Sequence, residues 1–285
     1  MERGRIADYL DVVPEVNVST KVTVEKLDGA LGAVVRGLRV SDYSDADLRE
    51  LADSLLPWWD ERLVLFFPGV HFSPSDQSRL AHCFGSHVAA TTETAADNRN
   101  IPTLRDEGFP EILLIDSHTP GFNPYVTAVW HTDVPFIEHP PKASLFYCEI
   151  AAVGAGDTMW NNQIAAYRRL SPPMQRMIDD LNVVMGAPPQ TTTHVHPMVR
   201  RHHASGEKSI FANRGWTRNI VGMSDAESRH VLEAVYAVSE RPENVVRWKW
   251  TSGDGALWDN RYTMHYAVAD YGSQHRRVRR ATIYD

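Results

Sequence analysis

The amino-acid sequence predicts one α+β domain built around a β-sandwich or barrel. Helical patterns are concentrated early in the chain, strand patterns dominate from residue 126 onward, and turn residues separate the segments at regular intervals. The chain has 285 residues, 43% of them hydrophobic, which is enough to bury a sizeable core. The sequence contains no internal repeat and no low-complexity tract.

The first elements are short strands and two helices. Residues 1–23 lack periodicity and are expected to form an N-terminal extension, so that residues 24–285 form a single domain. Ser44 is expected to cap a helix that runs to about Leu56, and the apolar run that ends at Pro68 predicts a buried strand. A second helix is expected from Ser73 to Phe84.

A long polar segment and a series of strands follow. Residues 91–110 are polar and aperiodic, which predicts a long loop of the kind that often forms an active-site lid. Helices are predicted over residues 164–170 and 173–181, and a third begins at a capping box at residues 224–227 and ends before Pro242. Strands are predicted in EILLIDS, VTAVWHTDVPF, KASLFYCEIAAV, GDTMWN, NVVRWKW and ALWDN.

The composition of the chain indicates which kinds of partner and which cellular compartment to expect. The formal net charge of −7 gives no overall attraction to nucleic acid or to an anionic membrane surface. No segment approaches the ~20 apolar residues that cross a bilayer, and the start MERGRIADYL lacks the apolar core of a secretory signal. Cys83 and Cys148 lie among apolar residues and read as small core residues, which fits a reducing cytoplasm.

His131 and Asp133 place two ionisable side chains in an otherwise apolar stretch. Residues two apart on a strand point to the same face, so this imidazole and carboxylate can supply two ligands to one metal. The chain has 13 histidines, and a hydrogen-bonded His–Asp pair explains the pattern better when it is taken alone. An iron site with two histidines and one carboxylate requires a second histidine elsewhere.

His265 is the strongest candidate for that second histidine, because it follows a strand and precedes a cluster of arginines. On a strand, Arg276, Arg280 and Thr282 share one face, whereas Arg277 and Arg279 share the other. Two explanations of the cluster remain open. It is either a solvated face or a pair of separate clamps for carboxylate or sulfonate groups, which match the guanidinium fork.

The remaining histidines are expected to be surface or satisfied core residues. His194 and His196 share a strand face in a stretch rich in Thr and Pro, and His202 and His203 lie in a basic loop that is expected to be exposed. Polar or helical settings surround the others, which are His71, His82, His87, His118, His139, His230 and His275.

Together these residues resemble the iron(II)/2-oxoglutarate dioxygenases of the taurine dioxygenase/TfdA group. His131 with Asp133, His265, and Arg276 eleven residues later match the ligand pattern of that family. The segments WHTDVPFIEHPP, GDTMWNNQIAAYRRLSPP, VRWKWTSGDGALWDNRYTMHYAVADY and RRATI are similar to the family in the same order, over about residues 24–285. The resemblance implies a double-stranded β-helix, or jelly-roll, with helices on its outside.

The resemblance also implies residue roles and cofactors. His131, Asp133 and His265 would hold Fe(II), Thr158 and Arg276 would bind the co-substrate 2-oxoglutarate, and such a triad leaves iron positions open for 2-oxoglutarate and O2. Turnover would give succinate, CO2 and a hydroxylated substrate, while the protein positions the substrate and excludes water.

The substrate is expected to be a small or medium-sized organic anion other than taurine. Arg280 resembles the arginine that holds the substrate sulfonate in taurine dioxygenase. His87 is shifted from the histidine that assists there, and Thr127 stands near an asparagine that contacts the taurine amine. The apolar and aromatic run around Tyr125 predicts a longer or more hydrophobic substrate.

For several apolar side chains, the sequence does not distinguish a place in the substrate pocket from a place in the core. Phe122, Tyr125 and Val126 fit a pocket or ordinary core packing equally well. The tryptophans Trp160, Trp216 and Trp258 are expected to belong to the core rather than to a pocket.

Two reaction outcomes remain open. A sulfonate, sulfate ester or aryloxy acid would fall apart after hydroxylation, whereas an amino acid or natural-product carboxylate would give a stable biosynthetic product. The intact triad with both arginines argues against a non-catalytic binding protein, and a zinc hydrolase would leave Arg276 and Thr158 without a purpose. Asp133 argues against a halogenase, because relatives that halogenate replace this carboxylate to open a position for halide. The resemblance further implies a homo-oligomer, either a dimer or a tetramer.

Overall fold

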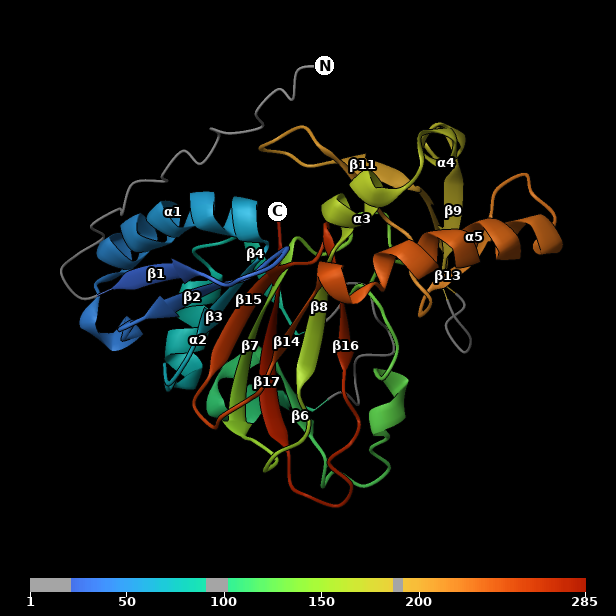
Figure 1. Ribbon diagram of the computed structural model, residues 1–285. Helices are drawn as coiled ribbons and strands as arrows, with labels where there is room; N and C mark the ends of the chain where they lie inside the picture. Colours follow the sequence, from blue (N-terminus) through green and yellow to red (C-terminus); the bar gives the residue numbers. More distant parts are fainter. Residues whose placement is uncertain (1–21, 91–101, 187–191) are drawn as a thin grey trace.

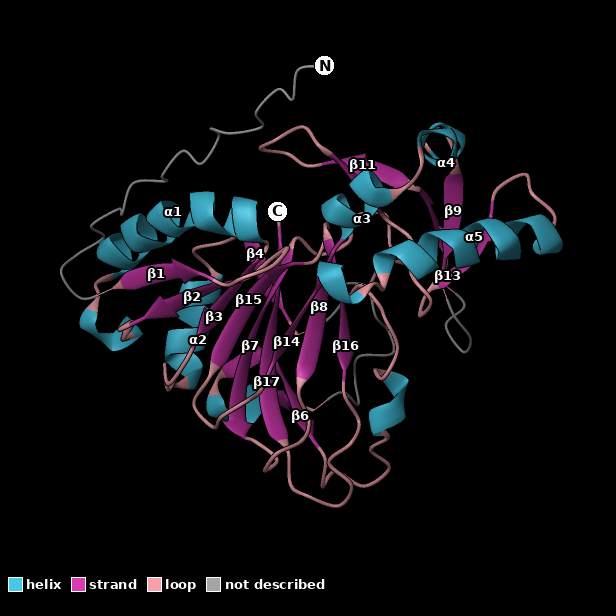
Figure 2. Ribbon diagram, in the orientation of Figure 1, coloured by secondary structure: helices cyan, strands magenta, loops and turns pink. Residues whose placement is uncertain are grey.

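The computed structural model describes residues 22–90, 102–186 and 192–285. Within these residues the fold is a two-sheet β-sandwich with helices on the outside (Figure 1; Figure 2). The large sheet has the strand order β1-β2-β3-β15-β7-β17-β6-β5, with β4 paired to β17 as well. All of these pairs are antiparallel except β2 with β3.

The strands of the large sheet are β1 (Thr23–Lys26), β2 (Ala33–Arg36), β3 (Val64–Phe67), β4 (His87–Ala89), β5 (Thr103–Leu104), β6 (Phe109–Asp116), β7 (Ala143–Ile150), β15 (Gly255–Asp259) and β17 (Arg277–Tyr284). A second, antiparallel sheet contains β8 (Thr158–Asn162) between β14 (Val245–Trp248) and β16 (Thr263–Ala267).

Aromatic side chains hold the two sheets together. Phe66 of β3 stacks on Trp248 of β14 with ring centroids 4.2 Å apart, and Trp160 of β8 contacts Trp258 of β15 at 5.6 Å. Phe66, Trp160 and Trp258 belong to one buried apolar cluster that spans both sheets, and the partly buried Trp248 packs against it. The double-stranded jelly-roll that the resemblance implied is therefore the fold that the strands and their packing form.

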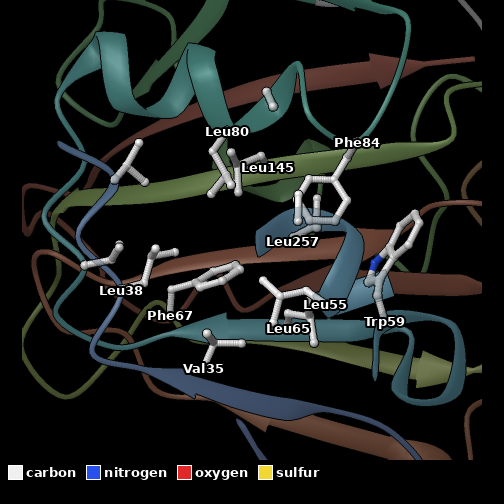
Figure 3. Packing of buried hydrophobic residues seen from close by; sticks show 14 of the residues in the cluster. Val35, Leu38, Leu55, Trp59, Leu65, Phe67, Leu80, Phe84, Leu145 and Leu257 are labelled. Carbon is white, nitrogen blue, oxygen red and sulfur yellow. The ribbon is translucent and has the colours of Figure 1, made fainter. Parts of the chain in front are cut away.

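Two helices cover the other face of the large sheet. They are α1 (Asp45–Arg62) and α2 (Pro74–Ala81), and they pack on β3, β7 and β15 through the largest apolar cluster (Figure 3). The side chains of Ser44 and Ser73 cap the two helices as predicted. However, α1 continues past Leu56 and through Pro57, because its last turn buries Trp58 and Trp59.

The segment between β8 and β14 forms a second lobe with its own apolar cluster. Its helices are α3 (Gln163–Arg169), α4 (Pro172–Ile178) and α5 (Asp225–Ser239), and α5 begins at the predicted capping box. Its strands are β9 (Asn182–Met185), β10 (His194–Pro197), β11 (Val199–Arg201), β12 (Lys208–Ile210) and β13 (Thr217–Ile220). Short 3-10 helices are η1 (Val40–Asp42), η3 (Arg105–Glu107), η4 (Pro124–Val126) and η5 (Pro242–Asn244).

Two predicted elements differ from the structure. The segment VTAVWHTDVPF is not a regular strand, because only His131 makes a β-bridge and Val134 has a left-handed φ of 50°. The predicted loop over residues 91–110 is shorter, since Thr103 already pairs with β6 and β6 begins at Phe109. Residues 1–21 and 91–101 lie outside the described residues, so the extension, the single domain and the lid stay predictions.

Candidate active site

A β-bridge brings the two predicted histidine ligands together. The backbone N–H of His131 donates to the carbonyl of His265 at 3.0 Å, and that of His265 donates to the carbonyl of His131 at 2.8 Å. The two rings lie 4.1 Å apart between centroids, and both residues are buried. His265 is on β16, whereas His131 lies in an irregular segment beside that strand. The bridge therefore replaces the regular strand that was predicted around His131.

Asn260 fixes the backbone around Asp133. The side-chain oxygen of Asn260 accepts from the Asp133 N–H at 2.8 Å, and its amide nitrogen donates to the Asp133 carbonyl at 2.9 Å. The left-handed conformation of Val134 then turns the chain away. One carboxylate oxygen of Asp133 (Oδ2) accepts from the Ser144 hydroxyl at 3.1 Å, and the other (Oδ1) faces the histidines.

The three candidate ligands converge on one point. Nε2 of His131 and Nε2 of His265 lie 3.9 Å and 3.8 Å from Oδ1 of Asp133, and one ligand atom from each residue lies within 4.8 Å of the others. His131 donates from Nδ1 to the Val129 carbonyl at 2.7 Å, so its Nε2 is the unprotonated nitrogen of the neutral ring.

The protonation states suit metal binding. Burial alone would raise the pKa of Asp133, but Arg280, His265, His131 and the Ser144 hydroxyl together lower it to about 2. Burial lowers the pKa of His265 to about 3, with a further contribution from His131. At neutral pH the group therefore offers one carboxylate and two neutral imidazoles.

This donor set fits a non-haem iron ion. Two imidazoles and one carboxylate are the ligands of iron(II) oxygenases, and they leave further coordination positions open. Nδ1 of His265 is buried and has no hydrogen bond among the described residues, while Nε2 is the nitrogen directed at Asp133. His131, Asp133 and His265 would hold the iron, which supplies the activation of O2 when it is bound.

A cavity of about 550 Å³ opens beside the three residues. Apart from His131, His265 and the arginines, its walls are mainly apolar and aromatic. They come from β6 (Leu113 and Ile115), from the segment of residues 119–127, and from the aromatic cluster between the sheets. Trp160 and Trp258 are core residues as predicted, being 0% and 2% exposed, yet both also line this cavity. Trp216 instead packs on Phe136.

Arg276 faces this cavity without an acidic partner. Its Nε donates to the Gly156 carbonyl at 3.2 Å, and the guanidinium lies 5.8 Å from the ring centroids of both Phe146 and Tyr271. Among the described residues it makes no ion pair. Gly156 permits this approach, because a Cβ there would lie 3.0 Å from Cδ of Arg276. Thr158 lines the same cavity, and its hydroxyl accepts from Trp250 at 2.9 Å.

Arg280 lies between the cavity and the candidate ligands. Its Nη1 donates to Oδ1 of Asp133 at 2.7 Å, and its Nε is buried without a partner among the described residues. Arg277 and Arg279, on the opposite face of the strand, both pair with Glu149. The arginine cluster is therefore not a solvated face, and Arg276 and Arg280 line this cavity whereas Arg277 and Arg279 do not. Thr282 is buried and donates to the Ala90 carbonyl.

Of the other residues that were predicted to bind the substrate, some line the cavity and others do not. Thr127 lines the cavity, as do its neighbours Phe122 and Val126. Tyr125 is 72% exposed and does not line the cavity. His87 is an exposed residue of β4 paired with Tyr284, and it too lies outside the cavity walls.

Sequence reasoning missed residues that shape the site without binding to it. Asn260 and Ser144 hold Asp133, and Gly215 lies so close to His131 that a Cβ would come within 2.9 Å of the histidine Cβ. Asn260 follows directly after the strand ALWD, and a polar residue that ends a buried strand near a candidate ligand was a usable signal. Ser144 and Gly215 carry no such signal.

Comparison with known proteins identifies the family. Residues 23–282 match the family described as "Taurine catabolism dioxygenase TauD, TfdA family". The match covers almost the whole chain, and the chain therefore belongs to this family. It is accordingly an oxidoreductase, an Fe(II)- and 2-oxoglutarate-dependent dioxygenase that uses O2 and acts on an organic anion.

Individual relatives agree with this assignment. The "Alpha-ketoglutarate-dependent sulfate ester dioxygenase" of Pseudomonas putida is 33% identical, over 92% of this chain and 89% of its own length. An "Alkylsulfatase" of Acinetobacter baylyi is also 33% identical, over 94% of this chain and 86% of its own. The crystal structure of a "Taurine Dioxygenase" from Burkholderia xenovorans has a TM-score of 0.76 and 28% identity, covering 93% of this chain and 89% of that one.

Within residues 22–90, 102–186 and 192–285, no helix is both long enough and apolar enough to span a bilayer.

Proposed function

We propose that this dioxygenase oxidises an alkyl sulfate ester at the carbon that carries the sulfate. In this proposal His131, Asp133 and His265 hold Fe(II), and Arg276 with Thr158 binds the distal carboxylate of 2-oxoglutarate. Arg280 binds the sulfate group, and the apolar walls of the cavity take the alkyl chain. Thr127 contributes to the substrate wall.

The observation that carries this proposal is the polarity of the cavity. The cavity walls contain the cationic side chains of Arg276 and Arg280 beside the candidate ligands His131 and His265, and Arg280 contacts Asp133. The remaining walls, including Leu113, Ile115 and Phe122, offer an alkyl chain apolar contacts. A substrate with one anionic group and an apolar tail matches this arrangement. The names of the two 33% identical relatives, a sulfate ester dioxygenase and an alkylsulfatase, support the same class.

The reaction balances without a further reagent. One atom of O2 enters succinate as 2-oxoglutarate loses CO2, and the other becomes a hydroxyl on the sulfate-bearing carbon. The O–H bond of this hydroxyl then breaks, a carbonyl forms, and the C–O bond to sulfate breaks with the electron pair leaving on sulfate. The products are an aldehyde, sulfate, a proton, succinate and CO2.

The test is to measure succinate and inorganic sulfate together from iron-loaded protein supplied with 2-oxoglutarate and O2. The panel contains linear alkyl sulfates of increasing length, alkyl sulfonates, aryloxyacetates and amino acids. We expect equal amounts of succinate and sulfate with medium-length alkyl sulfates. Release of sulfite or a phenol, or a stable hydroxylated amino acid, would assign one of the other substrate classes and contradict the sulfate ester proposal.

We also propose that the protein is a cytoplasmic homo-oligomer, either a dimer or a tetramer. Cys83 and Cys148 are both free thiols, which supports a reducing compartment. Sedimentation equilibrium at several protein concentrations measures the mass, and a monomer at all of them would contradict the oligomer. Fractionation of the source cells tests the location.

A further inference from the structure

A second group of possible metal ligands lies away from the cavity. Asp60, near the end of α1, meets His202 and His203 in the turn of the β11–β12 hairpin, which reaches over that helix end in Figure 1. One ligand atom from each of the three residues lies within 4.8 Å of the others. None of the three lines the cavity. His202 was predicted to be exposed, yet only 2% of it is accessible.

Two polar atoms of this group are buried and unpaired. Oδ1 of Asp60 and Nε2 of His202 are shielded from solvent and have no hydrogen bond among the described residues. Nε2 of His203 lies 3.1 Å from Oδ1 of Asp60, but the two atoms are not aligned as a hydrogen bond. Unpaired buried polar atoms are costly and rare in folded proteins. A cation bound between the three side chains would give each of these polar atoms a partner.

Ser205 contacts the second ring nitrogen of His202. The Ser205 backbone N–H donates to Nδ1 of His202 at 3.2 Å, and the Ser205 hydroxyl lies 3.1 Å from the same nitrogen. When Nε2 binds a metal, the proton moves to Nδ1, which then donates to the hydroxyl in place of the contact with the Ser205 N–H. Burial lowers the pKa of His202 and neighbouring His203 lowers it further, so the ring is neutral at neutral pH.

The surrounding charge also allows a cation. Arg261 lies beside His203, but both oxygens of Asp259 accept from it, at 2.7 Å and 3.1 Å. Among the described residues no lysine or arginine pairs with Asp60, whose ion-pair contact is with His203. Arg261 also donates to Nδ1 of His203 at 3.3 Å, its longest contact of the three, which it would give up when that nitrogen is protonated.

We propose that Asp60, His202 and His203 form a second metal site, for zinc or a similar divalent transition ion. Two imidazoles and a carboxylate are typical zinc ligands and are poor ligands for calcium or magnesium. The side chain of His203 is 44% exposed, so the ion can enter from solvent and keep water in a fourth position. The bound ion ties the end of α1 to the β11–β12 hairpin, and thus joins the main sandwich to the second lobe.

The test uses the full chain and zinc alone. Bound zinc is measured by elemental analysis after equilibrium dialysis against buffered zinc, for the wild type and for the His131→Ala/His265→Ala variant. The double variant lacks two iron ligands, so the zinc it retains reports the second site. We expect it to keep one equivalent. We further expect Asp60→Asn or His202→Gln to weaken that binding by at least tenfold.

Two further measurements make the outcome decisive. Asp60→Asn in the otherwise wild-type chain should lose one equivalent of zinc while keeping iron-dependent turnover of 2-oxoglutarate, which demonstrates correct folding. His139→Gln, which changes a side chain that is 91% exposed, is the matched control and should bind zinc as the wild type does. Less than one equivalent in the His131→Ala/His265→Ala variant, if folded, or undiminished binding by Asp60→Asn, would overturn the proposal.

Discussion

Strand β17 and Arg276, the residue directly before it, carry arginines on two faces with opposite surroundings. On one face Arg277 and Arg279 share Glu149, at 2.8 Å and 3.3 Å, and Arg279 also donates to the Phe72 carbonyl. On the other face Arg276 has no acidic partner among the described residues and faces the cavity, and Arg280 has only the candidate iron ligand Asp133. Four arginines that are close neighbours in the sequence therefore differ in the groups that neutralise their charges.

This difference separates a structural role from a binding role. A buried guanidinium that already has its carboxylate stabilises the fold and has little left for a ligand. A buried guanidinium without a carboxylate is costly to keep, and burial lowers the pKa of Arg276 accordingly. A buried cation of this kind is retained where the anionic group of a bound ligand neutralises its charge. The four arginines can therefore be ordered by what each substitution should cost.

The largest effect is expected for Arg276→Gln. The variant removes the charge that we assign to the distal carboxylate of 2-oxoglutarate, and loss of a buried charge-assisted pair costs about 3 kcal/mol, or roughly 100-fold. The KM for 2-oxoglutarate should rise by about that factor, while the free energy of unfolding should not fall. Steady-state succinate release and denaturant unfolding measure both. An unchanged KM for 2-oxoglutarate would show that Arg276 does not bind this co-substrate.

Arg280→Gln should act mainly on the substrate. The KM for an alkyl sulfate should rise by roughly 10- to 50-fold, with a smaller change for 2-oxoglutarate, because the charge-assisted bond to the sulfate is lost. Its contact with Asp133 predicts some loss of kcat as well. The comparison with Arg276→Gln is the control, and identical effects of the two variants on both substrates would contradict separate roles.

Arg279→Met should destabilise the fold and leave both KM values unchanged. It removes a side chain that is 2% exposed from Glu149, from the Phe72 carbonyl and from the ring of Tyr147. Breaking one side of such a buried pair costs about 2–3 kcal/mol, since Glu149 keeps Arg277 and some solvent contact. Urea unfolding measures the change. A raised KM for either substrate would mean that this face also contributes to binding.

The smallest effect is expected for Arg277→Gln. Its side chain is 34% exposed, so solvent screens its pair with Glu149, and the loss of unfolding free energy should be about 0.5 kcal/mol. Activity should match the wild type. This variant is also the matched control for Arg276→Gln, because the two residues are adjacent and differ in the face that they occupy.

Much of this arrangement could be predicted from the sequence, since period-two alternation places Arg276 and Arg280 on one face before any partner is known. The helix starts at Ser44, Ser73 and Ser224 were also predictable, because capping depends on local residues. Local rules failed where distant segments decide the geometry.

Three residues illustrate that failure. His131 is fixed by a bridge to a distant strand rather than by a strand of its own. Pro57 does not end its helix, because the tryptophans that follow it are buried against the sheet. His202 lies in a segment whose sequence is typical of an exposed basic loop, and only the tertiary fold buries it beside Asp60 of α1. In each case tertiary packing outweighs the local pattern.

The bridge between His131 and His265 has a consequence for folding. The two residues lie in the middle and near the end of the chain, and each donates its amide hydrogen to the other. Contacts of such high sequence separation form slowly, and they form only after the C-terminal strands have docked. Both amides should therefore exchange with deuterium only when the sandwich opens as a whole. The protection of these two amides against hydrogen exchange would therefore report both whether the site is intact and how stable the whole protein is.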